Sequence, residues 1–207
     1  MASASALGAE GPQFKSVHPD QTMKDPLLEL NKLLTALPKS CLVYVMGGLA
    51  LDGTCGSISR KHDDADLICW RKDVGIVQEA VRNIGYEIEV NTFPDEPNLP
   101  YRFETTDEDH MVSFNIIDEA PNDSFVMSFY HFPKQVFQKK LLGPISVSLD
   151  GIGFSAVSHE LLDKLNKNAG KYLNDLKERD PDLYNRLGYK IDNYNHDRKL
   201  LDQLAKK

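Results

Sequence analysis

The sequence predicts an α+β protein in which a mixed β-sheet with flanking helices is followed by a helical C-terminal segment. Two observations lead to this prediction. Up to about residue 157, short apolar segments and segments in which apolar and polar residues alternate are interspersed with amphipathic helical patterns. Only helical patterns follow Ser158. We therefore expect a flexible N-terminal tail at 1–24, a mixed domain at 25–157 and a helical segment at 158–207.

The mixed domain opens with a clear helix start. Asp25 can cap this helix and Pro26 suits its first position. The apolar stripe of the helix is formed by Leu27, Leu30, Leu34 and Leu37. The next predicted elements are a short buried strand at 41–46, about two helical turns at 49–55 and a strand at 65–70.

The later elements of this domain follow from the same kinds of pattern. A helix is expected at 72–85 and a strand at 86–91, whereas the three prolines of 93–100 predict a loop. The further predicted elements are strands at 101–105 and 111–118 around a polar turn at 106–110, a strand at 124–130, a short helix at 133–141, and two short strands on either side of Asp150-Gly151. Helix starts are expected at Ser158 and Asp180.

Composition and charge limit the classes of function. The formal net charge of −7 argues against a nucleic-acid binder that depends on a broad basic surface, and it suits a small or cationic substrate better. No apolar run reaches membrane-spanning length, and the N-terminus lacks the apolar core of a signal peptide. We therefore expect a cytoplasmic protein with no membrane partner. Cys41, Cys55 and Cys69 lack metal-binding spacing, so we expect core thiols in a reducing environment.

The segment 46–70 carries the chemistry. Asp64 and Asp66 are two positions apart at the start of a strand, so both side chains project to one face, while Ala65 and Leu67 pack inward. Two carboxylates on one face suit a hard divalent cation such as Mg²⁺, which takes one or two carboxylates together with phosphate oxygens and water. The sequence therefore predicts a metal site at Asp64 and Asp66.

A Gly-Gly turn precedes these acids. Gly47 and Gly48 have no Cβ, so a phosphate can approach their backbone N–H groups closely. A helix N-terminus is expected directly behind them, and such a terminus favours anions. The two glycines are therefore candidate nucleotide-binding residues.

Two basic residues lie between the glycines and the acids. Arg60 and His62 could approach the same phosphates through their charge and their hydrogen-bond donors. They could equally pair with Asp63 or Asp52. Both readings stay open at the level of sequence.

These residues together resemble a known family. Gly47-Gly48, a short helix that carries Asp52, and the run "SRKHDDADL" are similar to the nucleotidyltransferase superfamily that shares the DNA polymerase β palm. Within it they resemble the branch of aminoglycoside 2''-adenylyltransferases and lincosamide nucleotidyltransferases. The resemblance is dense over 43–70, and it implies a metal at Asp64 and Asp66.

The resemblance implies a transfer reaction. An NMP, expected to be AMP, would move from ATP or another NTP to a hydroxyl of a small-molecule acceptor such as an antibiotic, with Mg²⁺ or Mn²⁺ as cofactor. The acidic chain suits a cationic acceptor such as an aminoglycoside. The expected partners are thus a nucleoside triphosphate and a hydroxyl-bearing acceptor that the sequence does not name.

The family pattern requires a third carboxylate on a neighbouring strand, and this chain departs from it. In the matching segment, Ser113 and Asn115 occupy the positions that face the site, and neither is an acid. Glu104, on the partner strand of the hairpin, is one candidate for the missing catalytic group. Asp118 is the other, although it shares the face of Ser113 only if a bulge shifts the alternation. A second substrate or a partner could also supply the group.

Two other functions stay open. The missing acid favours a non-catalytic protein that binds a nucleotide or a partner on the same scaffold. A transferase of the toxin–antitoxin type, acting on protein or tRNA, would share the Gly-Gly turn and the paired aspartates.

Overall fold

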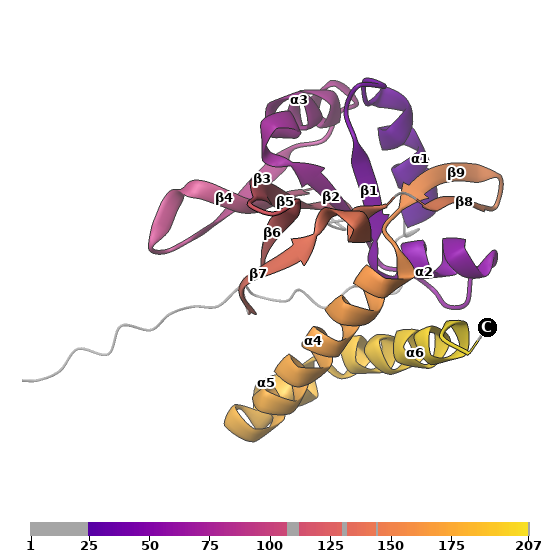
Figure 1. Ribbon diagram of the computed structural model, residues 1–207, viewed down its shortest axis with the longest axis vertical. Coiled ribbons are helices and arrows are strands. Elements are labelled where there is room, and N and C mark those ends of the chain that lie inside the picture. The colour runs from indigo at the N-terminus through magenta and orange to yellow at the C-terminus, as the bar shows by residue number, and fades with distance from the viewer. Residues whose placement is uncertain (1–24, 107–111, 130–131, 144, 207) are drawn as a thin grey trace, which may run out of the picture.

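A mixed β-sheet runs through the part of the chain that the computed structural model describes, residues 25–106, 112–129, 132–143 and 145–206 (Figure 1). Its strands are β1 (Val43–Met46), β2 (Ala65–Trp70), β3 (Ile88–Phe93), β4 (Glu96–Thr105), β5 (Val112–Ala120), β6 (Ser124–Phe129), β7 (Phe132–Gln138), β8 (Ile145–Leu149) and β9 (Ile152–Ala156). The α-helices are α1 (Pro26–Ala36), α2 (Gly47–Cys55), α3 (Val74–Asn83), α4 (His159–Arg179), α5 (Pro181–Arg186) and α6 (Gly188–Leu204). The expected α+β class is confirmed. The predicted tail at 1–24 and most of the predicted turn at 106–110 lie outside the described residues.

The strand order brings one row of side chains together. The order is β3-β4-β5-β2-β1-β9-β8, and β6 and β7 extend from the second half of β5. Asp66 on β2 lies opposite both Met46 on β1 and Ser113 on β5. Ser113 in turn lies opposite Glu104 on β4. Because directly paired residues point to the same face of a sheet, these four side chains share one face and one row.

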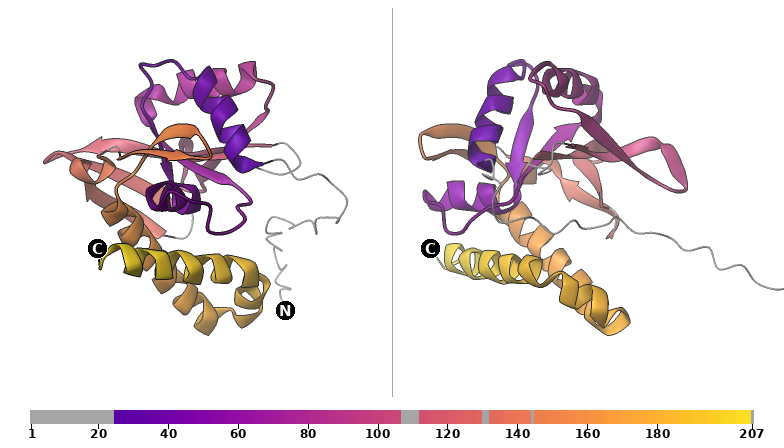
Figure 2. Two further views of the ribbon diagram at one scale, coloured as in Figure 1. Left: turned by 90° about the vertical axis from the view of Figure 1, so that its right-hand side faces the viewer. Right: turned by 180° about the vertical axis from the view of Figure 1, so that it is seen from behind.

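Helices cover both sides of the sheet (Figures 1 and 2). α1 and α3 lie together on one side, while α2 lies on the other side with α4 and α6. α6 runs back alongside α4 toward α2. The predicted apolar stripe of α1 is confirmed at Leu27 and Leu30, which are buried, and Leu34 and Leu37 are partly buried against the same core.

α2 begins at Gly47, two residues earlier than the predicted segment 49–55, and directly after β1. Its N-cap residue is Met46, whose side chain caps no backbone N–H group. The first turn of α2 therefore has no side-chain cap, so its first backbone N–H groups are left to water or to a ligand.

The prediction of a loop at 93–100 is wrong. This segment completes β3 and opens β4, and the pairing shifts register on either side of Thr92. Such irregular pairing tolerates Pro97 and Pro100, which cannot donate to a regular ladder. The rings of Phe93 and Tyr101 stack with centroids 4.3 Å apart, which stabilises the hairpin.

The prediction of a short helix at 133–141 is also wrong. This segment forms β7 and a 3₁₀ turn at Lys139–Leu142. Phe137 pairs directly with Phe125 across β6 and β7, and their rings stack with centroids 5.4 Å apart. The hydrophobic period of so short a segment fits a helix and a strand equally well. The contact with the neighbouring strand therefore determines which of the two forms.

Four turn and cap predictions are confirmed. The side chain of Asp25 caps α1 by accepting a hydrogen bond from Leu27 N. Asp150 and Gly151 have φ values of 49° and 81° in the turn between β8 and β9. The side chain of Ser158 caps α4 by accepting a hydrogen bond from Leu161 N. The side chain of Asp180 caps α5 in the same way.

No helix among the described residues is both long and apolar enough to cross a membrane. The expectation of core thiols holds for Cys69, which is buried and whose pKa burial raises to about 12. It is wrong for Cys55, which is exposed at the end of α2.

Candidate active site

Asp66 lies at the centre of the polar row on the sheet. Its Oδ1 accepts a hydrogen bond of 2.7 Å from Ser113 Oγ. Ala65 and Leu67, on either side of it, are fully buried, as the predicted alternation requires. The Asp66 carboxylate therefore projects from the sheet face while its neighbours pack into the core.

Asp64 directly precedes β2 and lies close to Asp66. The Asp66 carboxylate and, to a smaller degree, removal from water raise the pKa of Asp64 to about 7, against weaker opposing effects of Lys190 and Arg102. Because Asp64 keeps much of its surface in solvent, we attribute the rise to repulsion by Asp66. The structure thus brings the two predicted metal ligands together, and Lys190 and Arg102 compensate their mutual repulsion only in part.

Gly47 lies directly against Asp66. Its φ is +67°, and a Cβ at this position would lie 2.9 Å from Asp66 Oδ2. Both the backbone conformation and the carboxylate exclude a larger residue here. The first turn of α2 therefore begins beside the carboxylate, as a shared phosphate and metal site requires.

Gly48 is enclosed by the two basic residues. A Cβ at this position would lie 2.6 Å from His62 Cε1 and closer still to Arg60 Nη2. The Arg60 guanidinium donates to the Asp197 carboxylate on α6 through Nε at 3.0 Å and Nη2 at 3.1 Å. His62 Nε2 lies 2.7 Å from Asp52 Oδ2. The structure thus places both basic residues beside the glycine turn and pairs each with a carboxylate.

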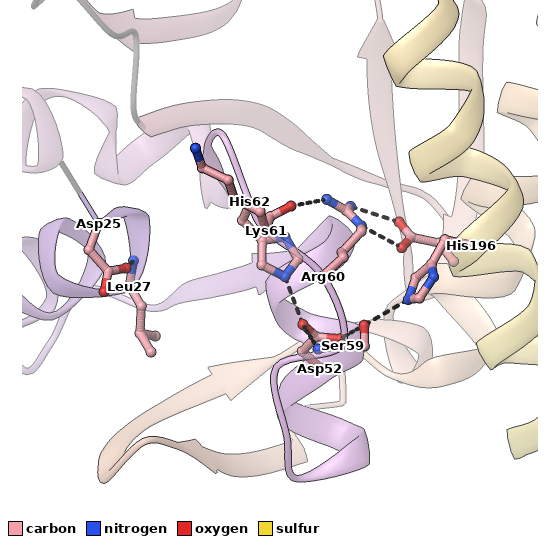
Figure 3. Close-up of polar contacts among 9 residues, drawn as sticks. Asp25, Leu27, Asp52, Ser59, Arg60, Lys61, His62 and His196 are labelled. Atoms are coloured by element: carbon pink, nitrogen blue, oxygen red, sulfur yellow. Dashed lines mark hydrogen bonds and ion pairs between the residues drawn. The ribbon is translucent and has the colours of Figure 1, made fainter. Parts of the chain in front are cut away.

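Asp52 is the centre of a buried network that links three segments (Figure 3). Besides contacting His62, its carboxylate accepts hydrogen bonds from the backbone N–H of Ser59, at 2.9 Å, and from the Ser59 hydroxyl. His196 Nε2 on α6 lies 2.9 Å from the same hydroxyl oxygen. Burial alone would raise the pKa of Asp52, but the hydrogen bonds from His62 and Ser59 outweigh it and lower the pKa. The network ties the loop 57–62 to α2 and α6.

Glu104 lies in the polar row, one strand beyond Ser113 and on the same face as Asp66. Arg102 Nη2 lies 2.8 Å from Glu104 Oε2, and Asn91 Nδ2 donates to Glu104 Oε1 at 3.4 Å. The structure therefore places this candidate for the third carboxylate at the row.

Asp118 lies elsewhere. β5 pairs with β2 and β6 without a register shift, so no bulge returns Asp118 to the face of Ser113. Its carboxylate instead binds the Arg71 guanidinium through both oxygens, with Nη2 2.8 Å from Oδ2. The structure does not bring this candidate to the site.

The carboxylate pair fits a divalent cation by its donor set. A cation between Asp64 and Asp66 would remove the repulsion that raises the pKa of Asp64. Within the described ranges, no group of three or more His, Cys, Asp or Glu residues could hold a metal ion by itself. A bound Mg²⁺ would therefore need phosphate oxygens and water to complete its shell, which is its usual mode in nucleotide enzymes.

Sequence reasoning missed the groups that reach the site from distant segments. Arg102 shares a strand face with Glu104, two positions away, and that alternation could have identified it. Lys190, His196 and Asp197 come from α6, which reaches the site only through tertiary packing. Nothing local in the sequence marks these three residues.

A mixed sheet that holds two carboxylates at the start of one strand, against a glycine turn that opens a helix, defines the nucleotidyltransferase class of fold. The family model for aminoglycoside-2''-adenylyltransferases matches residues 28–160, and the chain belongs to this family. None of the curated proteins compared with the chain matches it.

Solved structures share the fold at low sequence identity. A crystal structure of ANT(2'')-Ia in complex with adenylyl-2''-tobramycin is 20% identical, with a TM-score of 0.57 over 84% of this chain and 88% of that one. A putative nucleotidyltransferase from Thermotoga maritima is 14% identical, with a TM-score of 0.50 over 78% and 96%. The lincomycin-bound adenylyltransferase LnuA is 20% identical, with a TM-score of 0.49 over 66% and 81%. At these identities the structures of ANT(2'')-Ia and of the Thermotoga maritima protein show the fold alone.

Proposed function

We propose that this chain is an Mg²⁺-dependent nucleotidyltransferase that moves AMP from ATP to a hydroxyl of a small-molecule acceptor. One observation carries the proposal: Asp66, close to Asp64, lies against Gly47 at the uncapped start of α2. A triphosphate at this helix N-terminus and a cation at the carboxylates would meet in one place. Membership of the aminoglycoside-2''-adenylyltransferase family supports the same reaction.

In the proposed reaction the acceptor hydroxyl oxygen attacks the α-phosphorus of ATP, in line with the leaving group. A new oxygen–phosphorus bond forms while the bond from the α-phosphorus to the oxygen that bridges to the β-phosphate breaks. Pyrophosphate leaves with that electron pair, and the hydroxyl proton passes to a base. Mg²⁺ held by Asp64 and Asp66 would neutralise charge on the phosphate oxygens and orient them.

We assign the base to Glu104. It shares the row of Asp66. The family pattern places an aspartate one strand nearer to Asp66, at the position of Ser113 in this chain. The side chain of Glu104 is one methylene longer than that of an aspartate, which extends its reach toward Asp66. Arg102 restrains the Glu104 carboxylate from one side. Ser113 donates to Asp66 and so fixes the orientation of that carboxylate.

Arg60 and His62 have a positioning role in this proposal. They enclose Gly48 while their own charges and donors are directed to Asp197 and Asp52. They therefore hold the first turn of α2 in place next to the phosphates.

Calorimetry of ATP binding, with and without Mg²⁺, tests the site. Wild type is compared with Asp64→Asn/Asp66→Asn and with the control Asp150→Asn, which alters an exposed carboxylate in a turn where asparagine tolerates positive φ. We expect Mg²⁺-dependent binding that the double variant weakens at least about tenfold and the control leaves unchanged. Binding that ignores both Mg²⁺ and the double substitution contradicts the proposed site.

Pyrophosphate release separates transfer from binding alone. We expect Glu104→Gln to lower kcat about 100-fold or more, with ATP binding unchanged, because it removes a general base. The serine at position 113 favours one other candidate function, a nucleotide-binding protein that transfers nothing. That function would be indicated if wild type binds Mg²⁺ and ATP but releases no pyrophosphate with any acceptor.

A further inference from the structure

A groove of about 500 Å³ lies between β7, which ends one branch of the sheet, and the helix α4 (Figure 1). Three consecutive residues of β7 line it, Val136, Phe137 and Gln138, and we call it the β7–α4 groove. Its described lining residues include neither the carboxylates nor the glycines of the candidate active site. The groove is therefore not part of that site.

One edge of β7 is open to a further strand. Among the described residues, β7 pairs with β6 alone. Lys139 N donates to Asp123 O at 2.8 Å, and the register continues without a shift from this pair to Val136 opposite Val126. Hydrogen-bonded and non-hydrogen-bonded pairs alternate along an antiparallel ladder, so the backbone N–H and C=O groups of Val136 and Gln138 point away from β6. These groups are available to an added strand.

Lysines dominate the other wall of the groove. Lys164, Lys167 and Lys171 lie three and four positions apart, so they share one face of α4, and Lys140 comes from the turn after β7. Glu160 is the one carboxylate among the described lining residues, and it binds Lys164 at 3.0 Å. The groove therefore has a positive surplus in a chain whose formal net charge is −7.

Nearby carboxylates compensate this surplus only in part. Lys167 Nζ lies 2.7 Å from Asp163 Oδ2, but Arg198 binds the other oxygen of the same carboxylate, also at 2.7 Å. Lys140 and Lys171 form no ion pair with any residue that the structure describes. An anionic ligand would therefore meet lysines in the groove without breaking an existing ion pair.

The two faces of β7 differ at this edge. Gln135 faces α4, where its Oε1 accepts a hydrogen bond of 2.7 Å from Asn168 Nδ2. Phe137 shares that face, whereas Val136 points to the opposite face and is 66% exposed. A strand added to β7 would therefore direct every second side chain toward the lysines of α4 and the others toward the face of Val136.

We infer that the β7–α4 groove binds an extended acidic peptide segment of a partner protein, which adds to β7 as a further strand and carries acidic side chains at every second position. Backbone hydrogen bonds to Val136 and Gln138 supply affinity, and contacts of the acidic side chains with the lysines of α4 supply specificity. β-branched residues between the acids would pack against Val136. The inference does not depend on the proposed transfer.

Two other occupants suit the charge of the groove less well. Residues 1–24 of this chain carry two acidic side chains, Glu10 and Asp20, and two lysines, Lys15 and Lys24, so this segment has no negative surplus. Pairing of β7 with β7 of a second copy would bring two sets of lysines together without adding carboxylates. The lysines thus disfavour self-association at this edge and favour an acidic partner.

Fluorescence anisotropy of labelled peptides on the full chain tests the strand addition. The probe is Thr-Glu-Val-Glu-Val-Glu-Thr, and two versions of it are N-methylated, one at both valines and one at two of the glutamates. In antiparallel addition the residues opposite Val136 and Gln138 turn their N–H groups toward β7, and these are the valines, because they share the face of Val136. We expect methylation of the valines to weaken binding at least about tenfold. Methylation of the glutamates, which preserves the charge, should change it by less than about twofold.

Two pairs of variants locate the binding on the protein. Val136→Pro removes an N–H group that points away from β6, a position where edge strands accept proline, and Val136→Thr is the control that keeps this group. Lys140→Glu/Lys171→Glu reverses two charges in the groove, and Lys39→Glu/Lys72→Glu makes the same change at exposed lysines outside it. We expect Val136→Pro and the groove double variant each to weaken binding of the unmethylated probe at least about tenfold, while both controls retain it. The lysine variants serve if the circular dichroism spectrum shows that Val136→Pro does not fold.

Three outcomes would overturn the inference. The first is equal binding of the two methylated peptides, or peptide binding that ignores Lys140→Glu/Lys171→Glu. The second is a single-stranded oligonucleotide that binds at least as tightly as the peptide, which would assign the groove to a nucleic acid. The third is a dimer in sedimentation equilibrium that Val136→Pro dissociates, which would assign the open edge to a second copy of the chain. None of these measurements involves ATP or pyrophosphate, so the proposed function is tested separately.

Discussion

Two groups of acidic residues lie near the glycine turn: Asp52 by itself, and the pair Asp64 and Asp66. They differ in how their charge is compensated. The carboxylate of Asp52 is buried, is bonded by His62 and Ser59, and has a lowered pKa. Asp64 stands beside a second carboxylate, that of Asp66, and its pKa is raised to about 7. The compensated network holds α2, the loop 57–62 and α6 together. The pair, whose repulsion is compensated only in part, lowers stability and is the cation site of the proposed function. The comparison teaches that acids twelve positions apart in one segment can be held in opposite electrostatic environments.

Removing one acid from each group should change stability by very different amounts. Asp52→Ala is expected to lower the free energy of unfolding by about 3–5 kcal/mol, because it leaves His62 and Ser59 buried without their partner. Asp66→Asn is expected to change it by less than about 1 kcal/mol, because relief of repulsion offsets the weaker bond from Ser113. Urea denaturation of the metal-free protein measures both values. A larger loss in Asp66→Asn than in Asp52→Ala would contradict the comparison.

The glycine turn gives a second, smaller test of the compensated network. Gly48→Ala is expected to lower the free energy of unfolding by about 1–3 kcal/mol, because the added methyl group would displace Arg60 and His62. Gly75→Ala on α3 is the matched control, since nothing lies within 4 Å of its Cβ position, and it should raise stability by up to about 1 kcal/mol. Equal effects of the two substitutions in thermal unfolding would show that Gly48 is not enclosed as described.

The sequence predicted the parts of the site that are local. Asp64, Asp66 and Gly47 lie within 20 residues, and strand alternation with a glycine turn was enough to associate them. The same patterns predicted the caps and the hairpin at Asp150. They could not predict that Arg60 meets Asp197, because 137 positions separate the two and only the packing of α6 joins them.

Register was the second limit on prediction. Whether Glu104 or Asp118 reaches the row depends on which residues of β4, β5 and β6 pair, and a sequence without an alignment does not specify this. The hairpin of β3 and β4 was missed for a related reason: prolines are excluded from regular pairing but are accommodated where the pairing is irregular.

The smallest expected effects concern pH, and they have opposite signs in the two groups. The pKa of folded Asp52 is below its ordinary value of 3.8, so its stabilising contribution is present above that value and is lost as the pH falls through the lower folded-state pKa. Wild type should therefore be more stable than Asp52→Asn by a constant amount between pH 7 and pH 5, and this difference should shrink below about pH 4. A difference that grows in acid would contradict the assignment.

The pKa of folded Asp64 is raised from 3.8 to about 7, so its repulsion of Asp66 lowers stability most above pH 7 and is relieved as the pH falls toward 4. Relative to Asp64→Asn, wild type should therefore gain stability on acidification through this range, by less than about 1 kcal/mol because Asp64 is exposed. Urea midpoints of the two proteins in chelator-treated buffer between pH 8 and pH 4 measure the gain. Added Mg²⁺ would compensate the repulsion and should reduce the pH dependence of wild type alone. Parallel pH profiles of the two proteins without metal would show that the carboxylates do not repel each other, and the distinction between the two groups of acids would then fail.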